Sequence, residues 1–370
     1  MPGIVHAADP HLSRLTWADR PEVTGDSFYA LWQVINFCLI NRAALSLLGD
    51  AFDNTRPDPT AVAEACRALD KMEEAGLPVF YIQGNHEYDA YTPWLSVHSW
   101  PQHVDQRVFE VDQMKFYGLD WRPSAAIKEA LKAVPPDVTK LAMHQSMAEL
   151  MGTITQPECS TMDIPDHVTT VVVGDYHKHT SYTAAFAGRQ TKTLYSPGPF
   201  NARNILQSGP KGVWYMVDGE VRSIQIRTRQ IIDETVHTPE DLDRVMSQVH
   251  NWRMQMHGTP ISEPLVRIHY AAGEFPDAGP RMAALLGGPT HLFLDMVAAA
   301  TIDVQAAAET IVQHTPETLI AAHVPDEQTR SRLTFLLQPQ RTARKAVEEI
   351  MNEIAQTNSP QLVSVPGAGD

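Results

Sequence analysis

Five apolar segments of this chain are each followed closely by side chains that bind metal ions. Each segment has the composition of a buried strand. The segments and the residues after them are 4–8 with Asp9 and His11, 43–48 with Asp50, 79–82 with Asn85 and His86, 141–143 with His144, and 171–173 with Asp175 and His177. Carboxylates, amides and imidazoles suit divalent cations such as Mn²⁺ and Mg²⁺. Because α/β sheets hold ligands at the carboxyl ends of their strands, this pattern predicts a metal centre.

Asp50 is the residue around which the predicted centre is organised. Two-metal sites hold their ions ~3.5–4 Å apart and need a ligand that both ions share, and Asp50 is the candidate for that role. A Gly-Asp pair is common in turns, and so is the Asp-Pro pair before His11, which could equally be a turn with a surface histidine. The recurrence of such residues at five strand ends therefore carries the prediction.

The histidines allow more than one assignment. His86 follows Asn85, whose neutral oxygen can act as a ligand where carboxylates already supply charge, so His86 is free to act on substrate. A lone histidine such as His144 more often sits in ordinary packing, but its place at a strand end favours a ligand. His179 is an alternative ligand if the register slips by two residues, and otherwise it contacts phosphate or solvent.

Length and composition exclude some classes of protein. With 370 residues and 43% hydrophobic residues, we expect one large domain and a smaller one. A net charge of -15 argues against a protein that coats nucleic acid with a general basic surface, although a nuclease with a local basic strip remains open. The cysteines show no metal-binding spacing and are odd in number, which predicts a reduced, cytoplasmic setting. No signal peptide or membrane span is expected.

The order of the motifs resembles that of a known enzyme family. Asp-x-His, Gly-Asp-x-x-Asp, Gly-Asn-His-Glu, an isolated His and Gly-Asp-x-His follow one another as in the calcineurin-like metallophosphoesterases. Within that family the chain is most similar to the Mre11/SbcD branch of DNA-repair and phage nucleases, through residues 49–57, residues 195–198 and the layout after residue 230. The resemblance implies an α/β fold, in which a double-sheet sandwich is flanked by helices.

The resemblance also implies a domain order. A metallophosphoesterase domain is expected at 1–230, a small α/β capping domain at 231–303, C-terminal helices at 304–358 and a disordered tail at 359–370. Within the cap we predict an αβαβ unit, whose first helix begins after Thr238. The last helix, 342–356, carries Val347, Ile350, Met351 and Ile354 on one face. Such a face packs on its own protein or, as in this family, binds the coiled-coil root of an SMC-like ATPase.

Site roles follow from the matching family positions. The first metal is assigned to Asp9, His11, Asp50 and His177, and the second to Asp50, Asn85, His144 and Asp175. Asp175 stands where the family commonly has a histidine, and a carboxylate there favours hard cations. His86 is assigned as the general acid for the leaving oxygen. Asp53 falls where the family can carry a second histidine on the substrate side.

The resulting prediction is a DNA exonuclease or endonuclease that depends on two divalent cations, Mn²⁺ or Mg²⁺. We expect it to form a homodimer and to act with an SMC-like ATPase of the Rad50/SbcC type, in the cytoplasm or, if phage-encoded, in the host cytoplasm. Two alternatives remain open, a mainly structural subunit that holds DNA ends and a small-molecule phosphodiesterase. The basic residues 178, 189, 192, 203, 211, 222, 227 and 229 form either solvated strand faces or a phosphate-binding strip.

Overall fold

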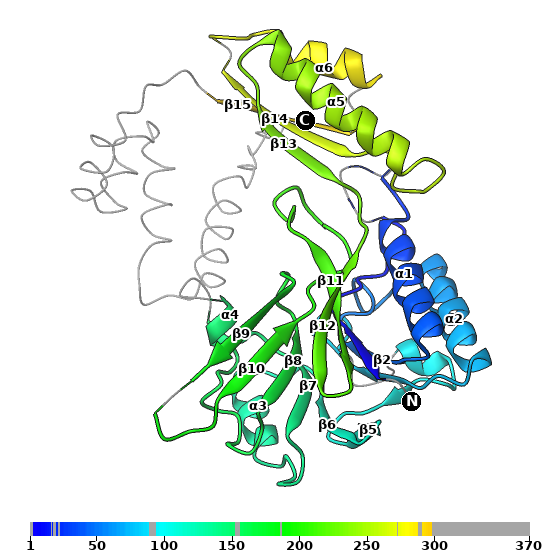
Figure 1. Cartoon of the computed structure of the whole chain (residues 1–370), viewed down its shortest axis with the longest axis vertical. Coiled ribbons are helices and arrows are strands. Elements are labelled where there is room, and N and C mark those ends of the chain that lie inside the picture. The colour runs from blue at the N-terminus through cyan, green and yellow to red at the C-terminus, as the bar shows by residue number, and fades with distance from the viewer. Residues whose placement is uncertain are drawn as a thin grey trace, which may run out of the picture. The chain divides into compact units, whose positions relative to one another are not determined.

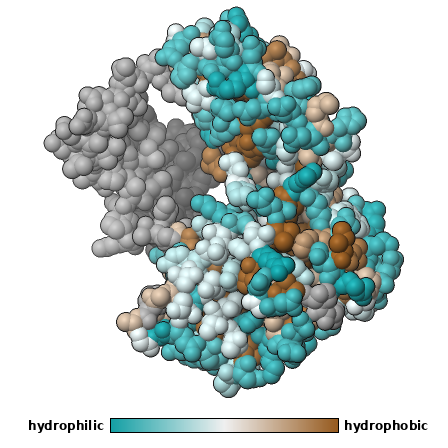
Figure 2. All heavy atoms as spheres, viewed as in Figure 1, coloured by the Kyte–Doolittle hydropathy of each residue, from teal (hydrophilic) through white to brown (hydrophobic). Residues whose placement is uncertain are grey.

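A computed structural model of the chain describes residues 3–15, 17, 20, 23–88, 94–151, 156–185, 187–271, 273–287 and 291–297. All of them belong to one compact unit that ends at Ala298. The helices predicted at 304–358 and the tail at 359–370 lie outside the described residues. None of the helices in the described ranges is both long and apolar enough to cross a membrane. Hydrophilic side chains cover much of the face shown in Figure 2, as the charged composition leads one to expect.

The first of two six-stranded sheets has the strand order β12-β11-β1-β2-β3-β4. Three of its strands, β2, β11 and β12, are labelled in Figure 1. β1 to β4 run parallel, and the hairpin of β11 and β12 adds an antiparallel edge next to β1. The strands of this sheet are β1 (Ile4–Ala7), β2 (Ala44–Leu48), β3 (Val79–Ile82), β4 (Gln102–His103), β11 (Lys211–Val217) and β12 (Glu220–Ile226).

The second sheet repeats this plan with the order β5-β6-β7-β8-β10-β9. Its centre, β6 to β8 with β10, is parallel, and β5 and β9 pair antiparallel at the two edges. The strands of this sheet are β5 (Val108–Val111), β6 (Met114–Leu119), β7 (Lys140–His144), β8 (Thr170–Gly174), β9 (Thr180–Ala184) and β10 (Lys192–Ser196).

Alternating side chains of the central strands build a layered sandwich. In β2, Leu45 and Leu47 face the core beneath the helices, whereas Ala44 and Leu48 face the core between the sheets. In β8, Val172 joins that inter-sheet core from the other side. Successive residues of a strand point to opposite faces, so strands covered on both faces are apolar throughout. The predicted double-sheet sandwich of the α/β class is confirmed.

Helices cover the outer faces of both sheets. α1 (Asp26–Asn41) and α2 (Pro59–Glu74) pack on the first sheet, and α3 (Ser124–Leu131) packs on the second. Two short elements, η1 (Trp94–Val97) and α4 (Ala148–Met151), lie in connections. The side chain of Asp58 caps α2 by accepting a hydrogen bond from the Ala61 amide at 2.9 Å. Pro59 takes the first helical position, where its missing N–H is not needed.

A third, smaller sheet consists of β13 (Ile231–Thr235), β14 (Leu265–Ala271) and β15 (Leu292–Val297), all parallel. α5 (Pro239–Gln255) and α6 (Ala278–Leu286) pack on it around a separate apolar core. The unit is thus βαβαβ in the structure, and the predicted αβαβ unit omitted the first strand, β13. β13 was missed because only Ile232 in it is buried, so the strand carries no apolar run. The division at residue 231 into a capping domain stays a prediction.

Candidate metal centre

The predicted strand-end residues meet where the two sheets adjoin. Asp9, Asp50 and Asn85 follow β1, β2 and β3 of the first sheet, whereas His144 and Asp175 lie at the ends of β7 and β8 of the second. β2 packs against both β7 and β8, which brings the two sets of strand ends together. The site thus draws on two sheets, and the single crevice that one open sheet would provide is not what the structure shows.

Asp50 lies at the middle of the cluster and is buried. Its Oδ2 atom is 3.7 Å from His11 Nε2 and 3.6 Å from His144 Nε2, two imidazoles that come from different sheets. Its Oδ1 atom accepts a hydrogen bond from the His86 amide at 2.9 Å. One carboxylate oxygen therefore faces both groups of donors, while the other is held by the backbone.

The first group of donors consists of Asp9, His11 and His177. The Nε2 atoms of His11 and His177 are 3.4 Å apart, and donor atoms of all three residues lie within 4.8 Å of one another. His179 lies elsewhere: its Nδ1 atom is 3.0 Å from the Pro197 carbonyl, and its ring stacks on Trp214 at 4.6 Å. The geometry favours His177 over His179 as the donor.

The second group surrounds His144. Its Nδ1–H donates to the Leu48 carbonyl at 2.7 Å, which leaves the Nε2 lone pair free to bind a cation. That Nε2 atom is 3.1 Å from Asn85 Oδ1 and 4.0 Å from Asp175 Oδ1. Asp9 and Asp50 also form a possible metal-binding set with His144. Asp9 therefore lies near both groups, although the sequence assigned it to the first alone.

The donor atoms lie close enough together to bind common cations. Ligand atoms ~2.1 Å from one Mg²⁺ or Mn²⁺ lie about 3 Å apart when adjacent and about 4.2 Å apart when opposite. The distances of 3.1, 3.4, 3.6, 3.7 and 4.0 Å between the donors here lie between these two values, so small movements of the side chains would let them converge on bound cations. Oxygen and nitrogen donors without any thiolate are the set that hard divalent cations prefer.

Without a cation, several groups of the cluster have strongly shifted pKa values. Burial and the nearby charge of Asp50 raise the pKa of Asp9 to about 8. For His144, burial opposes protonation, but the carboxylates of Asp50, Asp9 and Asp175 outweigh it and raise the pKa to about 9. Burial and then Arg203 lower the pKa of His177 to about 4. A divalent cation would stabilise ionised carboxylates and neutral imidazoles together, so the cluster is completed by positive charge.

The backbone at the site adopts conformations that few residues tolerate. Asp9, His11, Asp50 and Asp175 have φ values of 50°, 43°, 49° and 82°. Asp and His enter this left-handed region more readily than most residues, and such strain gathers at functional sites. Close packing adds a second constraint, because a Cβ at Gly84 would lie 2.0 Å from Asp50 Oδ1. The turn after β3 can therefore approach Asp50 only with glycine at that position.

Glu87 has a role that the sequence analysis did not assign. Its buried carboxylate accepts hydrogen bonds from the amides of Ala51 at 3.2 Å and Phe52 at 3.1 Å. It thereby holds the loop that carries Asp50. Burial, followed by repulsion from Asp50, raises the pKa of Glu87 to about 7. The only signal in the sequence was its place as the last residue of the Gly-Asn-His-Glu motif.

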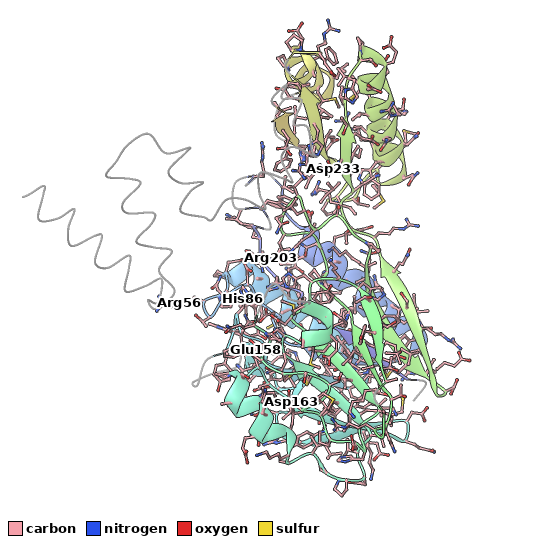
Figure 3. The ribbon with its side chains drawn as sticks, turned by 90° about the vertical axis from the view of Figure 1, so that its left-hand side faces the viewer. Arg56, His86, Glu158, Asp163, Arg203 and Asp233 are labelled. Atoms are coloured by element: carbon pink, nitrogen blue, oxygen red, sulfur yellow. The ribbon has the colours of Figure 1, made fainter. Side chains whose placement is uncertain are left out.

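Arg203 is a second residue that sequence reasoning placed elsewhere, in the basic strip. Its guanidinium pairs with Asp53, and its Nη1 atom lies 3.3 Å from both ring nitrogens of His11. Asp53 Oδ1 is 3.5 Å from His11 Nδ1. Asp53 thus braces a candidate ligand and an arginine, whereas the sequence placed it beside substrate. Arg203 and His86, which both neighbour His11, are labelled together in Figure 3.

His86 is less enclosed than the donors. Its side chain is 36% exposed, and its Nδ1 atom hydrogen-bonds the Asp53 carbonyl at 2.8 Å. Because a carbonyl can only accept, Nδ1 carries the proton and Nε2 faces the site, 3.9 Å from Asp50 Oδ2. This orientation leaves Nε2 available to a substrate. Potential ligand atoms of His11, Asp53 and His86 also lie within 4.8 Å of one another, so His86 could bind either a cation or the substrate. The number of metal ions bound after His86 is replaced distinguishes the two roles.

Comparison with known proteins bears on this site. Residues 3–179 match the model of the calcineurin-like phosphoesterase family. The chain contains a calcineurin-like phosphoesterase domain. Enzymes of this family use divalent metals, and the Asp and His groups described above are candidate ligands. The family resemblance seen in the sequence is confirmed for residues 3–179, and membership of this family indicates a hydrolase.

Two DNA-repair proteins are similar to this chain at low sequence identity. The chain is 25% identical over 238 residues to the DNA double-strand break repair protein Mre11 of Methanosarcina acetivorans, covering 57% of this chain and 37% of that protein. It is 25% identical over 191 residues to the protein of the same name from Methanosarcina mazei, covering 48% and 30%. The chain thus spans about a third of the length of these two relatives. A solved archaeal phosphodiesterase aligns with a TM-score of 0.32 at 13% identity, over 60% of this chain and 99% of that one.

Proposed function

We propose that this protein hydrolyses phosphodiester bonds of DNA with two divalent cations bound between the two sheets. The main support for this proposal is the position of Asp50, whose Oδ2 atom lies near His11 on one side and His144 on the other. Asp9 and His177 would complete one cation site, and Asn85 and Asp175 the other. Mn²⁺ is the cation that we propose, with Mg²⁺ as the second choice for the same donors.

The residues around the cations divide the remaining work. When bound, two cations clamp a phosphodiester and lower the pKa of a coordinated water. Arg203, held by Asp53, would donate to the phosphate oxygens, on which negative charge develops during the reaction. His86 in its protonated form, with Nδ1–H held by the Asp53 carbonyl, would donate its Nε2 proton to the departing sugar oxygen. Asp53 positions both His11 and Arg203, and this is the role that we now propose for it.

DNA is proposed as the substrate because the named relatives are DNA-break repair proteins. We further propose that the chain dimerises and works with an SMC-like ATPase, which would bind at 304–358. The basic strip of the sequence analysis is reduced in the structure. Five of its eight residues form ion pairs with acids, namely Arg189, Lys192, Arg203, Arg222 and Arg229. With a net charge of -15 and only three residues of this strip outside ion pairs in the described part of the chain, the protein should bind DNA weakly and lose it as salt is added.

One assay tests the proposal and separates it from the alternatives. The purified full chain is incubated with end-labelled single- and double-stranded DNA and with bis(p-nitrophenyl) phosphate, each with Mn²⁺, Mg²⁺ or EDTA. We expect cleavage of DNA and of the chromogenic diester with Mn²⁺, and none in EDTA. Cleavage of the chromogenic diester alone would contradict DNA as substrate and favour a small-molecule phosphodiesterase. Cleavage of neither would favour a structural subunit.

The choice between His177 and His179 gives a separate prediction. His177→Ala should lower the number of Mn²⁺ ions bound per chain, because the ring that lies 3.4 Å from His11 is removed. His179→Ala should bind as many Mn²⁺ ions as the wild type. The two ring nitrogens of His179 are engaged by the Pro197 carbonyl and the Ser223 hydroxyl, neither of which is a candidate metal ligand. Metal content after dialysis measures both. Loss of metal in His179→Ala but not in His177→Ala would show that the register is off by two residues.

A further inference from the structure

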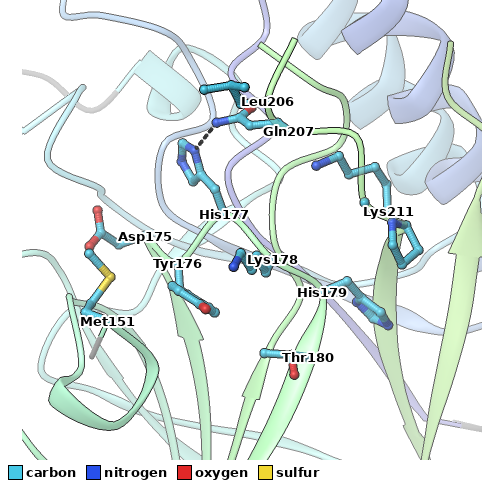
Figure 4. Close-up of a pocket in the computed structure, with 12 residues that line it drawn as sticks. Met151, Asp175, Tyr176, His177, Lys178, His179, Thr180, Leu206, Gln207 and Lys211 are labelled. Carbon is cyan, nitrogen blue, oxygen red and sulfur yellow. Dashed lines mark hydrogen bonds between the residues drawn. The ribbon is translucent and has the colours of Figure 1, made fainter. Parts of the chain in front are cut away.

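A cavity of about 590 Å³ adjoins the metal-ligand cluster (Figure 4). Asp175 and His177 border it on the side of the candidate cations, and Lys211 borders it elsewhere. The remaining wall is largely apolar and includes Met151, Tyr176, Leu206 and Pro210. Cavities of this volume hold small organic molecules, so the space can take much more than the two ester oxygens of a scissile phosphate.

Lys211 is unusual among the basic residues of this region. It begins β11 and is only 4% exposed, yet within the described part of the chain its ammonium forms no ion pair or hydrogen bond. Two other buried cations are paired: Lys192 lies 3.5 Å from Asp166, and Arg229 lies 2.7 Å from Asp26. Burial, without an acid to oppose it, lowers the pKa of Lys211 to about 8.

The Lys211 side chain is largely buried but lines this cavity, so its ammonium can contact a molecule bound there, and an anion would supply the partner that it lacks among the described residues. The Lys211 side chain extends toward Gln207 and His177 in Figure 4, and Gln207 Nε2 hydrogen-bonds His177 Nδ1 at 3.2 Å. Lys211 also borders a second cavity of about 340 Å³, but no candidate metal ligand lines that one. The first cavity is the one that Lys211 shares with candidate metal ligands, so an anion bound there would contact the lysine close to the candidate cations.

We propose that this cavity binds one unpaired nucleotide of the substrate, and that Lys211 holds the phosphate next to the scissile one. The inference rests on the proposed function and adds the substrate subsite to it. A polynucleotide carries a phosphate at each end of every internal nucleotide, which matches cations on one side and a lysine on another. Tyr176 and Lys178 also line the cavity; Lys178 Nζ lies over the Tyr176 ring at 6.0 Å, and a base would stack on the part of the ring that faces the cavity. Enzymes that hold a single nucleotide in a pocket take it out of the duplex, and we expect the same here.

Inhibition of bis(p-nitrophenyl) phosphate hydrolysis tests the subsite without requiring DNA cleavage. Thymidine 3′,5′-bisphosphate should inhibit the Mn²⁺-loaded full chain about tenfold more strongly than thymidine 3′- or 5′-monophosphate, the gain expected of one hydrogen bond to a charged group. Lys211→Met should abolish this difference. Lys115→Met, which removes an exposed lysine of β6, should retain it. Equal inhibition by all three nucleotides in the wild type, or a preference that survives Lys211→Met, would overturn the inference.

Thermal unfolding without nucleotide distinguishes a ligand-binding lysine from a structural one. If Lys211 waits for an anion, methionine removes an uncompensated charge, and the Tm of Lys211→Met should rise by about 2 °C. A fall in Tm would show that Lys211 stabilises the fold itself, and would count against the subsite. Failure of the proposed function is recognised separately, because it appears as intact DNA in the cleavage assay whatever the inhibition data show.

Discussion

Asp50→Asn is expected to abolish Mn²⁺-dependent hydrolysis, with a rate loss of ~10³-fold or more, because the stabilisation that bound metal supplies is worth several kcal/mol. The substitution keeps the size of the side chain, and asparagine tolerates the φ of 49° that alanine would adopt only with strain. It removes the negative charge shared between His11 and His144. Calorimetry with Mn²⁺ should show weakened binding of both ions.

The structure offers a matched control for this variant. Asp218 is exposed in the turn between β11 and β12 and has a φ of 51°, so Asp218→Asn makes the same change in the same backbone conformation. It should bind two Mn²⁺ ions and retain wild-type activity. If Asp50→Asn keeps near-wild-type cleavage while its fold is intact by circular dichroism, the two-metal assignment is wrong.

His86→Ala is expected to lose roughly 10²–10⁴-fold in the rate of cleavage, the usual contribution of a general acid or base. Its Nε2 atom faces the site, and its Nδ1 atom is fixed by the Asp53 carbonyl. The His86 ring is not one of the proposed metal ligands, so the variant should still bind two Mn²⁺ ions in calorimetry. His250→Ala, which removes an exposed imidazole from α5, should leave both rate and metal binding unchanged.

The metal content of His86→Ala decides between two roles. His11, Asp53 and His86 lie within 4.8 Å of one another, so a cation could in principle use His86 as a ligand. A variant that binds one Mn²⁺ ion instead of two would show that His86 is a ligand. The proton donor would then have to be another group.

The strand ends that carry Asp9, Asp50, Asn85, His144 and Asp175 could be predicted from the sequence, because both parts of the signal are local. An apolar run predicts a buried strand, and the residue type that follows it indicates the chemistry. The order of the motifs then indicated the family, which the match over residues 3–179 confirms. β13 escaped the same reasoning, because an edge strand with one buried residue has no apolar run.

The tertiary structure alone decided which charges are paired. In the sequence, Lys211, Arg203 and Arg229 are equivalent members of one basic strip. In the structure, Arg229 is buried against Asp26, Arg203 is held by Asp53 beside His11, and Lys211 is buried with no partner among the described residues. The partners in the Arg229–Asp26 pair are separated by 203 positions in the sequence, and those in the Arg203–Asp53 pair by 150. No local pattern can report them, because the partner of a charge is chosen by which loops the packing of two sheets brings together.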